Sequence, residues 1–131
     1  MKNTTLLLLC LFVLATFQYS FANTNETDAP LEQAFSTPEQ TWGQFKTAIL
    51  EGDFDSAHEC CRQDKSKGVL KFKKMGTEKR KNIVESMQEI EKIHLQENTA
   101  KYKLIRNSNG SALSTFVYFE KIDNEWKIEN Y

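Results

Sequence analysis

The chain has 131 residues, of which 27% are charged and 40% are hydrophobic, and its formal net charge at pH 7 is -1. This length suffices for one compact domain with a single core. The near-neutral total gives no indication of nucleic acid as a partner. Beyond the first 22 residues no apolar run approaches the length that crosses a bilayer, so we expect no transmembrane segment in the mature chain.

The first 22 residues have the pattern of an export signal. Lys2 gives a short positive start, residues 6–14 form an apolar run, and Ser20-Phe21-Ala22 places small residues where a signal peptidase accepts them. We therefore expect cleavage near Ala22 and a mature protein that is periplasmic or secreted. Cys10 lies inside the apolar run rather than after a small residue, which disfavours lipidation.

The helical part of the chain follows a short leader. Residues 23–36 are polar and lack a hydrophobic period, which predicts a flexible leader. We expect the first helix to begin with Thr37 as its cap and Pro38 at its first position, with Gln40 completing a capping box. This helix should end at Gly52, and its buried stripe should consist of Trp42, Phe45 and Ile49.

Further helical segments are expected before the sheet. Asp53 is the predicted cap of a second short helix. Residues 63–76 carry apolar side chains scattered among lysines and predict a loop with a short helical turn. Thr77 is the predicted cap of the next helix, whose buried stripe should consist of Ile83, Met87 and Ile90.

The hydrophobic period then changes from helical to alternating, which predicts strands. We expect four of them, over residues 91–97, 100–104, 113–119 and from 126 onward. Asn109-Gly110 and Asp123-Asn124 supply turns between them. Helices followed by an antiparallel meander indicate the α+β class: N-terminal helices packed on a curved four-stranded antiparallel sheet. The expected core includes Trp42, Phe45, Val117, Phe119 and Trp126.

Three stretches resemble a known family. They are Thr37-Pro38-Glu39, Gly52-Asp53-Phe54-Asp55 and Phe119-Glu120-Lys121-Ile122-Asp123-Asn124-Glu125-Trp126-Lys127-Ile128. Together they resemble the nuclear transport factor 2-like (cystatin-like) superfamily, and within it small exported bacterial domains of unknown function. The resemblance covers nearly all of residues 37–131 and implies a cone formed by a curved sheet around helices, often with a pocket at its open end. One fold hosts enzymes, binders and adaptors alike, so the resemblance bears on fold alone.

The cysteines and histidines give little indication of chemistry. Cys60 and Cys61 are adjacent, so a disulfide between them would close a strained ring. We expect both on a helix, one facing the core and one facing outward, with an intermolecular disulfide or a redox role as the alternative. His58 and His94 share no ligand spacing with them, so the sequence predicts neither a metal site nor a cofactor.

Acid–base catalysis would need two groups whose environments separate their pKa values. Tyr102 should point into the cone. Glu120 and Glu129 occupy strand positions that face outward, and no acidic residue falls on the inward-facing positions of the last three strands. The sequence therefore favours a non-enzymatic module that binds a ligand or a protein, with Tyr102 at the candidate pocket. A small acid–base enzyme of the isomerase or dehydratase type is the alternative.

The outer face of the sheet is a candidate docking surface. Phe116 and Tyr118 alternate with Val117 and Phe119 and so face the side of the strand opposite to the core. Both faces of that strand therefore carry large apolar side chains. Either the stems of neighbouring lysines cover them, or the face docks on a partner, which includes a second copy of the chain. An assembly protein that forms a homodimer through this face is a further alternative.

Residues 62–81 hold nine basic and two acidic residues, a local net charge near +7. The candidate anion-facing patch consists of Lys71, Lys73, Lys74, Lys79, Arg80 and Lys81. It is either a solvated stretch or a surface for an anionic partner, such as lipid head groups, an acidic polysaccharide or an acidic protein. Nucleic acid is disfavoured because the segment has only Phe72 as a stacking aromatic.

Overall fold

The computed structural model describes residues 35–108 and 110–131; the expected signal segment, the leader up to residue 34 and Asn109 lie outside the described residues. The helical elements come first: α1 (Pro38–Glu51), α2 (Phe54–Glu59), the 3-10 turn η2 (Gln63–Lys65), α3 (Lys67–Lys73) and α4 (Thr77–Ser86). The strands follow: β1 (Met87–Leu95), β2 (Thr99–Ser108), β3 (Ser111–Ile122) and β4 (Glu125–Asn130). This order confirms the predicted α+β class.

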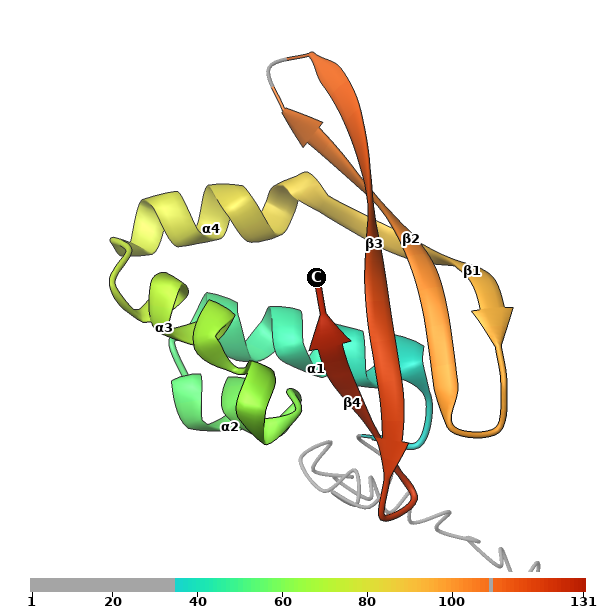
Figure 1. Ribbon diagram of the computed structural model, residues 1–131. Coiled ribbons are helices and arrows are strands. Elements are labelled where there is room, and N and C mark those ends of the chain that lie inside the picture. The colour runs from blue at the N-terminus through green and yellow to red at the C-terminus, as the bar shows by residue number, and fades with distance from the viewer. Residues whose placement is uncertain (1–34, 109) are drawn as a thin grey trace, which may run out of the picture.

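The strands form one open sheet in the order β1-β2-β3-β4, and each is antiparallel to its neighbours. The helices lie together on one side of the sheet, as Figure 1 shows, and the β2–β3 hairpin extends beyond them at the top of the view. The chain ends between the sheet and the helices, where the Tyr131 side chain comes against Gly68 of α3.

Local signals set the ends of α1 and the start of α2, as predicted. The Gln40 amide donates to Thr37 Oγ1 over 3.2 Å, and Pro38 occupies the first turn. The Gln40 side chain accepts from the Ser36 hydroxyl. It makes no bond with the Thr37 amide among the described residues, so the predicted capping box is only half formed. Gly52 ends the helix in the left-handed conformation, with φ at 80°, which an L side chain adopts only with strain. Asp53 Oδ1 then accepts from the Ser56 amide and caps α2.

The core lies between α1 and the inner face of the sheet. Trp42, Phe45 and Ile49 form the buried stripe of α1, as expected. The inner sheet positions are also buried, and they are Ala100, Tyr102, Leu104, Val117, Phe119, Trp126 and Ile128. Phe35, from the last part of the expected leader, packs against this core, and its carbonyl accepts from the Trp126 amide.

Several local predictions were wrong. Residues 63–76 form η2 and a complete helix, α3, because Val69 and Phe72 supply a buried stripe. The last helix ends at Ser86, so Met87 and Ile90 belong to β1. Its N-cap is Gly76, with no side-chain capping bond, rather than Thr77. The sheet strands also begin earlier or run longer than the alternation indicated.

Candidate functional site

A cavity of about 350 Å³ opens between α3, α4, the distal part of β2 and the end of β4. Phe72, Met75 and Ile83 give it an apolar side. Lys65, Lys71 and Arg106 are the cations in its lining, and no carboxylate side chain among the described residues joins them. Ligand pockets commonly combine an apolar surface with a few polar groups in a volume of about 300–1,000 Å³.

Two polar atoms at this cavity lack partners. Arg106 Nε and Tyr131 Oη are both buried and make no hydrogen bond with any described residue. No carboxylate of the described chain lies within ion-pair distance of Arg106. Burial raises the pKa of Tyr131 above its usual range, so the phenol stays protonated and keeps its donor. Most buried polar groups in proteins are paired, so these two atoms leave hydrogen-bonding capacity unused in the wall of the cavity. Trp42 Nε1 and Arg80 Nε are the unpaired buried side-chain atoms elsewhere among the described residues.

Sequence reasoning did not identify Arg106 or Tyr131. The predicted second strand ended at residue 104, which left Arg106 near a turn, whereas β2 continues to Ser108. The alternation of Tyr102 and Leu104 extended by two residues would have placed Arg106 on the inner face. Nothing in the sequence around Tyr131 indicated that its hydroxyl would lie against α3.

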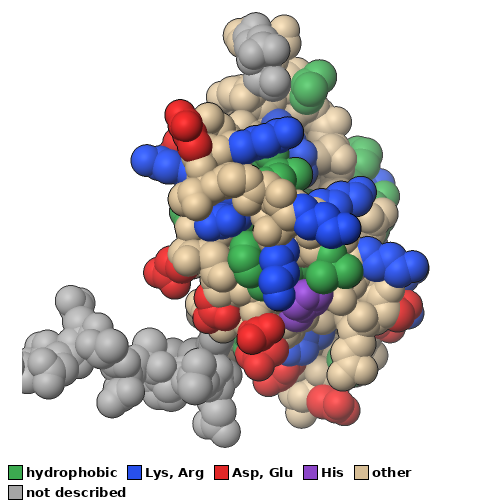
Figure 2. Space-filling view, turned by 90° about the vertical axis from the view of Figure 1, so that its left-hand side faces the viewer, with side chains coloured by type: hydrophobic (Ala, Val, Ile, Leu, Met, Phe, Trp, Pro, Cys, Tyr) green, Lys and Arg blue, Asp and Glu red, His purple; other side chains and the backbone are tan. Residues whose placement is uncertain are grey.

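Beside the cavity lies a surface that we call the lysine face, which consists of Lys71, Lys73, Lys74, Lys79 and Lys81. All five side chains are exposed, and Figure 2 shows Lys and Arg side chains spread over the side of the molecule that carries α3 and α4. Of these five lysines, only Lys81 has an ion-pair partner among the described residues, Glu85 at 3.6 Å. Lys71 also lines the cavity, so the two features adjoin.

Arg80 does not belong to the lysine face, which corrects the sequence prediction. Its side chain is only 8% exposed. The guanidinium carbon lies 5.2 Å from the Phe54 ring centroid, and Nη1 donates to the Met75 carbonyl over 3.5 Å. Arg80 therefore joins α4 to the start of α2. The sequence predicted exposure because Arg80 lies between two lysines in a basic run.

Tyr102 is buried, and its hydroxyl donates to Glu39 Oε1 of α1 over 2.6 Å. Burial, and then the bond to this carboxylate, raise the pKa of Tyr102. Sequence reasoning missed this partner because it considered acidic residues of the sheet only. Neither Tyr102 nor Glu39 lines the cavity beside α3. His94 is exposed on β1, away from the inner face.

On the outer sheet face, Phe116 and Tyr118 lie side by side with ring centroids 6.5 Å apart. Lys101 of β2 covers both, with Nζ at 4.0 Å from the Phe116 centroid and 5.5 Å from that of Tyr118. Phe116 nevertheless remains 42% exposed. Lysine therefore covers part of the apolar bulk, and part of it stays accessible.

Cys60 and Cys61 are both buried, and neither forms a disulfide within the described ranges. Cys61 lies beyond α2 and forms a parallel bridge with Ile128 at the edge of β4. The prediction that one thiol faces outward was therefore wrong. Burial raises the pKa of each thiol from 9.0 to about 12, so the reactive thiolate is scarce at neutral pH.

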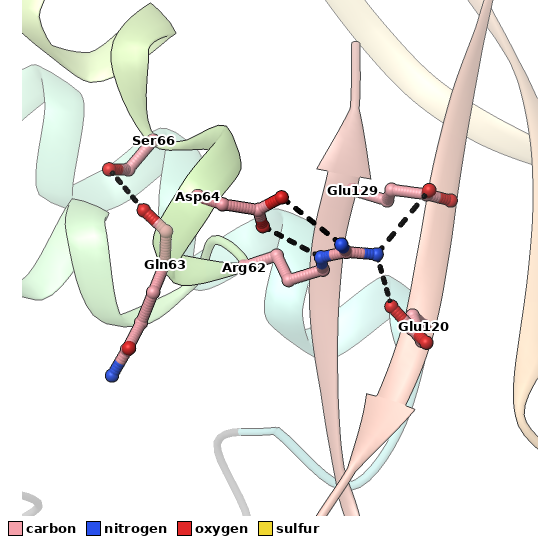
Figure 3. A network of polar contacts seen from close by, with 6 residues as sticks. All are labelled: Arg62, Gln63, Asp64, Ser66, Glu120 and Glu129. Carbon is pink, nitrogen blue, oxygen red and sulfur yellow. Dashed lines mark hydrogen bonds and ion pairs between the residues drawn. The ribbon is translucent and has the colours of Figure 1, made fainter.

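A charged cluster fixes the segment that leads into α3 (Figure 3). Arg62 binds both oxygens of Asp64, at 2.7 and 3.1 Å, and Nη1 contacts Glu120 Oε2 at 2.7 Å and Glu129 Oε1 at 3.6 Å. The bonds to Arg62 lower the pKa of Asp64. The cluster ties η2 to β3 and β4, and so places Lys65 at the cavity.

Comparison with known proteins gives no match: no protein-family model, no curated protein and no solved structure matches this chain. Within residues 35–108 and 110–131, none of the helices combines the length and apolar character that crossing a membrane requires.

Proposed function

We propose that the chain is an exported, non-enzymatic binding module that docks on an anionic lipid surface through the lysine face. The observation that carries this proposal is the exposure of five lysines of α3, its C-cap and α4, only one of them paired with a carboxylate of the described chain. Unpaired exposed lysines create a local positive potential although the chain as a whole carries a net charge of -1. Each Lys near an anionic membrane contributes about 1 kcal/mol of attraction.

The composition of α3 favours a lipid surface over another anionic partner. Leu70 lies on this helix between Lys67 and Lys71 and is 48% exposed, while Val69 and Phe72 face the core. Helices that lie at a membrane interface combine apolar side chains with lysines or arginines, and Leu70 with its neighbouring lysines has this combination on a small scale. Leu70 can enter the head-group region while the ammonium groups contact the phosphates.

Support for a role other than catalysis comes from the surroundings of Tyr102. Tyr102 and Glu39 form a hydrogen-bonded pair of titratable groups, as acid–base catalysis requires. The cavity, however, lies beside Arg106 and not beside this pair. A general acid or base must lie within reach of a bound substrate. The described residues that line the cavity include no carboxylate side chain and no histidine.

We also propose that the domain belongs with the nuclear transport factor 2-like superfamily that its sequence resembles. Helices packed on one face of an open antiparallel sheet are compatible with that fold. Export is part of the same proposal and rests on the apolar run and on Ser20-Phe21-Ala22. N-terminal sequencing of the exported protein should begin at Asn23; a mature form that keeps residues 6–14 would show an anchor instead.

Vesicle co-sedimentation tests the docking. The protein should bind vesicles of phosphatidylglycerol mixed with phosphatidylcholine, and not phosphatidylcholine alone. Binding should weaken steeply with salt because the Debye length falls from about 10 Å at 0.1 M to about 3 Å at 1 M. The variant Lys73→Glu/Lys74→Glu should lose binding, and neither lysine lines the cavity.

Lys92→Glu/Lys103→Glu is the matched control. It makes the same change in net charge on β1 and β2, away from the lysine face. This control should bind as the unaltered protein does. Equal retention of both double variants on anionic vesicles would overturn the proposal, because total charge rather than the lysine face would then govern binding.

Assembly through the outer sheet face is a second candidate function, and the exposure of Phe116 favours it. Sedimentation analysis should then show a dimer that Phe116→Ser converts to a monomer. A monomer at all accessible concentrations would exclude this function.

A further inference from the structure

We propose that the cavity beside α3 binds an amphiphilic anion: an oxyanion head, carboxylate or phosphate monoester, carried on a short apolar body. The head would bind near Arg106 and Lys71, and the body would contact Phe72, Met75 and Ile83. The proposal does not rest on docking at a membrane, because the cavity and the lysine face share only Lys71.

The charge of the lining requires a negative head. Three cations line the cavity without a carboxylate side chain among the described lining residues. Arg106 is half-buried, and its Nε is buried without a partner in the described chain. A donor left unpaired in this way costs stability. An oxyanion satisfies such a guanidinium because two parallel N–H groups can bind two of its oxygens. Tyr131, whose hydroxyl is a second buried donor without a partner in the described chain, lines the same cavity.

The other side of the cavity requires an apolar body. Met75 and Ile83 are half-buried and pack against the core, and Phe72 is buried. Inorganic phosphate or acetate would leave these surfaces in contact with water, whereas an alkyl or aryl group would cover them and gain hydrophobic stabilisation. The ligand should therefore bind more tightly than its head alone.

The volume bounds the size of the ligand. A cavity of about 150 Å³ can hold benzene, so the volume of about 350 Å³ accommodates roughly twice as many heavy atoms. A head with a chain of about eight carbons meets this limit. Diacyl lipids exceed it, so the cavity is suited to a single-chain amphiphile or a small aromatic acid.

Isothermal titration calorimetry of the protein with four probes tests the inference. Octanoate and octyl phosphate should bind, while acetate, which lacks the body, and octanol, which lacks the charge, should bind at least tenfold more weakly. Comparing the affinity for octanoate with that for octyl phosphate shows which head, carboxylate or phosphate, the cavity prefers. Equal affinity for octanol and octanoate would overturn the proposal, and so would the absence of binding by both octyl anions.

Variants place the binding in this cavity. Arg106→Gln should weaken octanoate binding by at least about tenfold, because it removes charge-assisted hydrogen bonds. Lys71→Gln should also weaken binding, whereas its matched control Lys79→Gln, a lysine outside the cavity, should not. Met75→Trp should fill the space and abolish binding.

Circular dichroism should first confirm that each variant folds. If Arg106→Gln does not fold, the pair Lys71→Gln and Lys79→Gln still decides the matter. Unchanged affinity in Lys71→Gln and Met75→Trp would place octanoate elsewhere and would overturn the assignment. Loss of vesicle binding by Lys73→Glu/Lys74→Glu with retained octanoate binding would show that the two proposed sites act separately.

Discussion

Replacing Gly68 by alanine tests the packing that brings Tyr131 to the cavity. A Cβ atom at Gly68 would lie 2.1 Å from Tyr131 Oη and 2.8 Å from its Cζ, which is far inside van der Waals contact. The tyrosine ring cannot withdraw freely, because its centroid lies 5.0 Å from that of Phe45 and 6.2 Å from that of Trp42. Either α3 or Tyr131 must therefore move.

Two opposing effects decide the sign of the change in stability. Gly→Ala within a helix favours folding by about 1 kcal/mol, and Gly68 is the second residue of α3, where the gain is at most that. Overpacking a filled core costs about 1–3 kcal/mol. We therefore expect Gly68→Ala to lower the free energy of unfolding by up to about 2 kcal/mol.

Urea unfolding followed by tryptophan fluorescence measures this change, and Gly43→Ala is its control. Gly43 lies within α1, and a Cβ atom added there would meet no atom of another element within 4 Å, so alanine at this position should stabilise the protein by about 1 kcal/mol. Tyr131→Phe removes the closest atom and should reduce the penalty of Gly68→Ala. If Gly68→Ala stabilised the protein as much as Gly43→Ala, Tyr131 would not pack against α3.

Two further outcomes are expected. Trp126→Ala should cost about 3–5 kcal/mol, because the side chain is 6% exposed; a melting temperature within a degree or two of the original would contradict its place in the core. Because folding raises the pKa of Cys60 and Cys61 from 9.0 to about 12, stability should be full below pH 9 and fall above it, by at most about 1.4 kcal/mol per pH unit per thiol. Burial also raises the pKa values of Tyr102 and Tyr131, but these groups lower the stability only at higher pH. In the variant Cys60→Ala/Cys61→Ala, the free energy of unfolding measured with urea should therefore no longer fall between pH 9 and 10. An unchanged fall would show that other groups cause it.

Much of the fold could be predicted because local interactions determine it. Thr37 and Asp53 accept hydrogen bonds from amides three residues onward, and Gly52 adopts a left-handed conformation that ends a helix. Such contacts depend on near neighbours in the chain, so the sequence records them directly. The alternation over β2 and β3 likewise shows which side chains face the core.

Helix α3 and the start of β1 could not be predicted in the same way. A helix of seven residues has little stability of its own, so α3 depends on the burial of Val69 and Phe72 against other elements. Met87 and Ile90 are three residues apart, which suits a helical stripe. The same spacing suits β1, because its register shifts between these two residues and brings both to the inner face.

The α+β class, the main core residues and the basic character of residues 62–81 follow from the sequence alone. The burial of Arg80 among exposed lysine neighbours becomes visible only once the helices are packed together. The tertiary structure also brings Lys71, Arg106 and Tyr131 to one cavity. Whether a charged side chain has a partner depends on residues that are far away in the chain but close in space. The order of residues in the sequence does not show which of them come close.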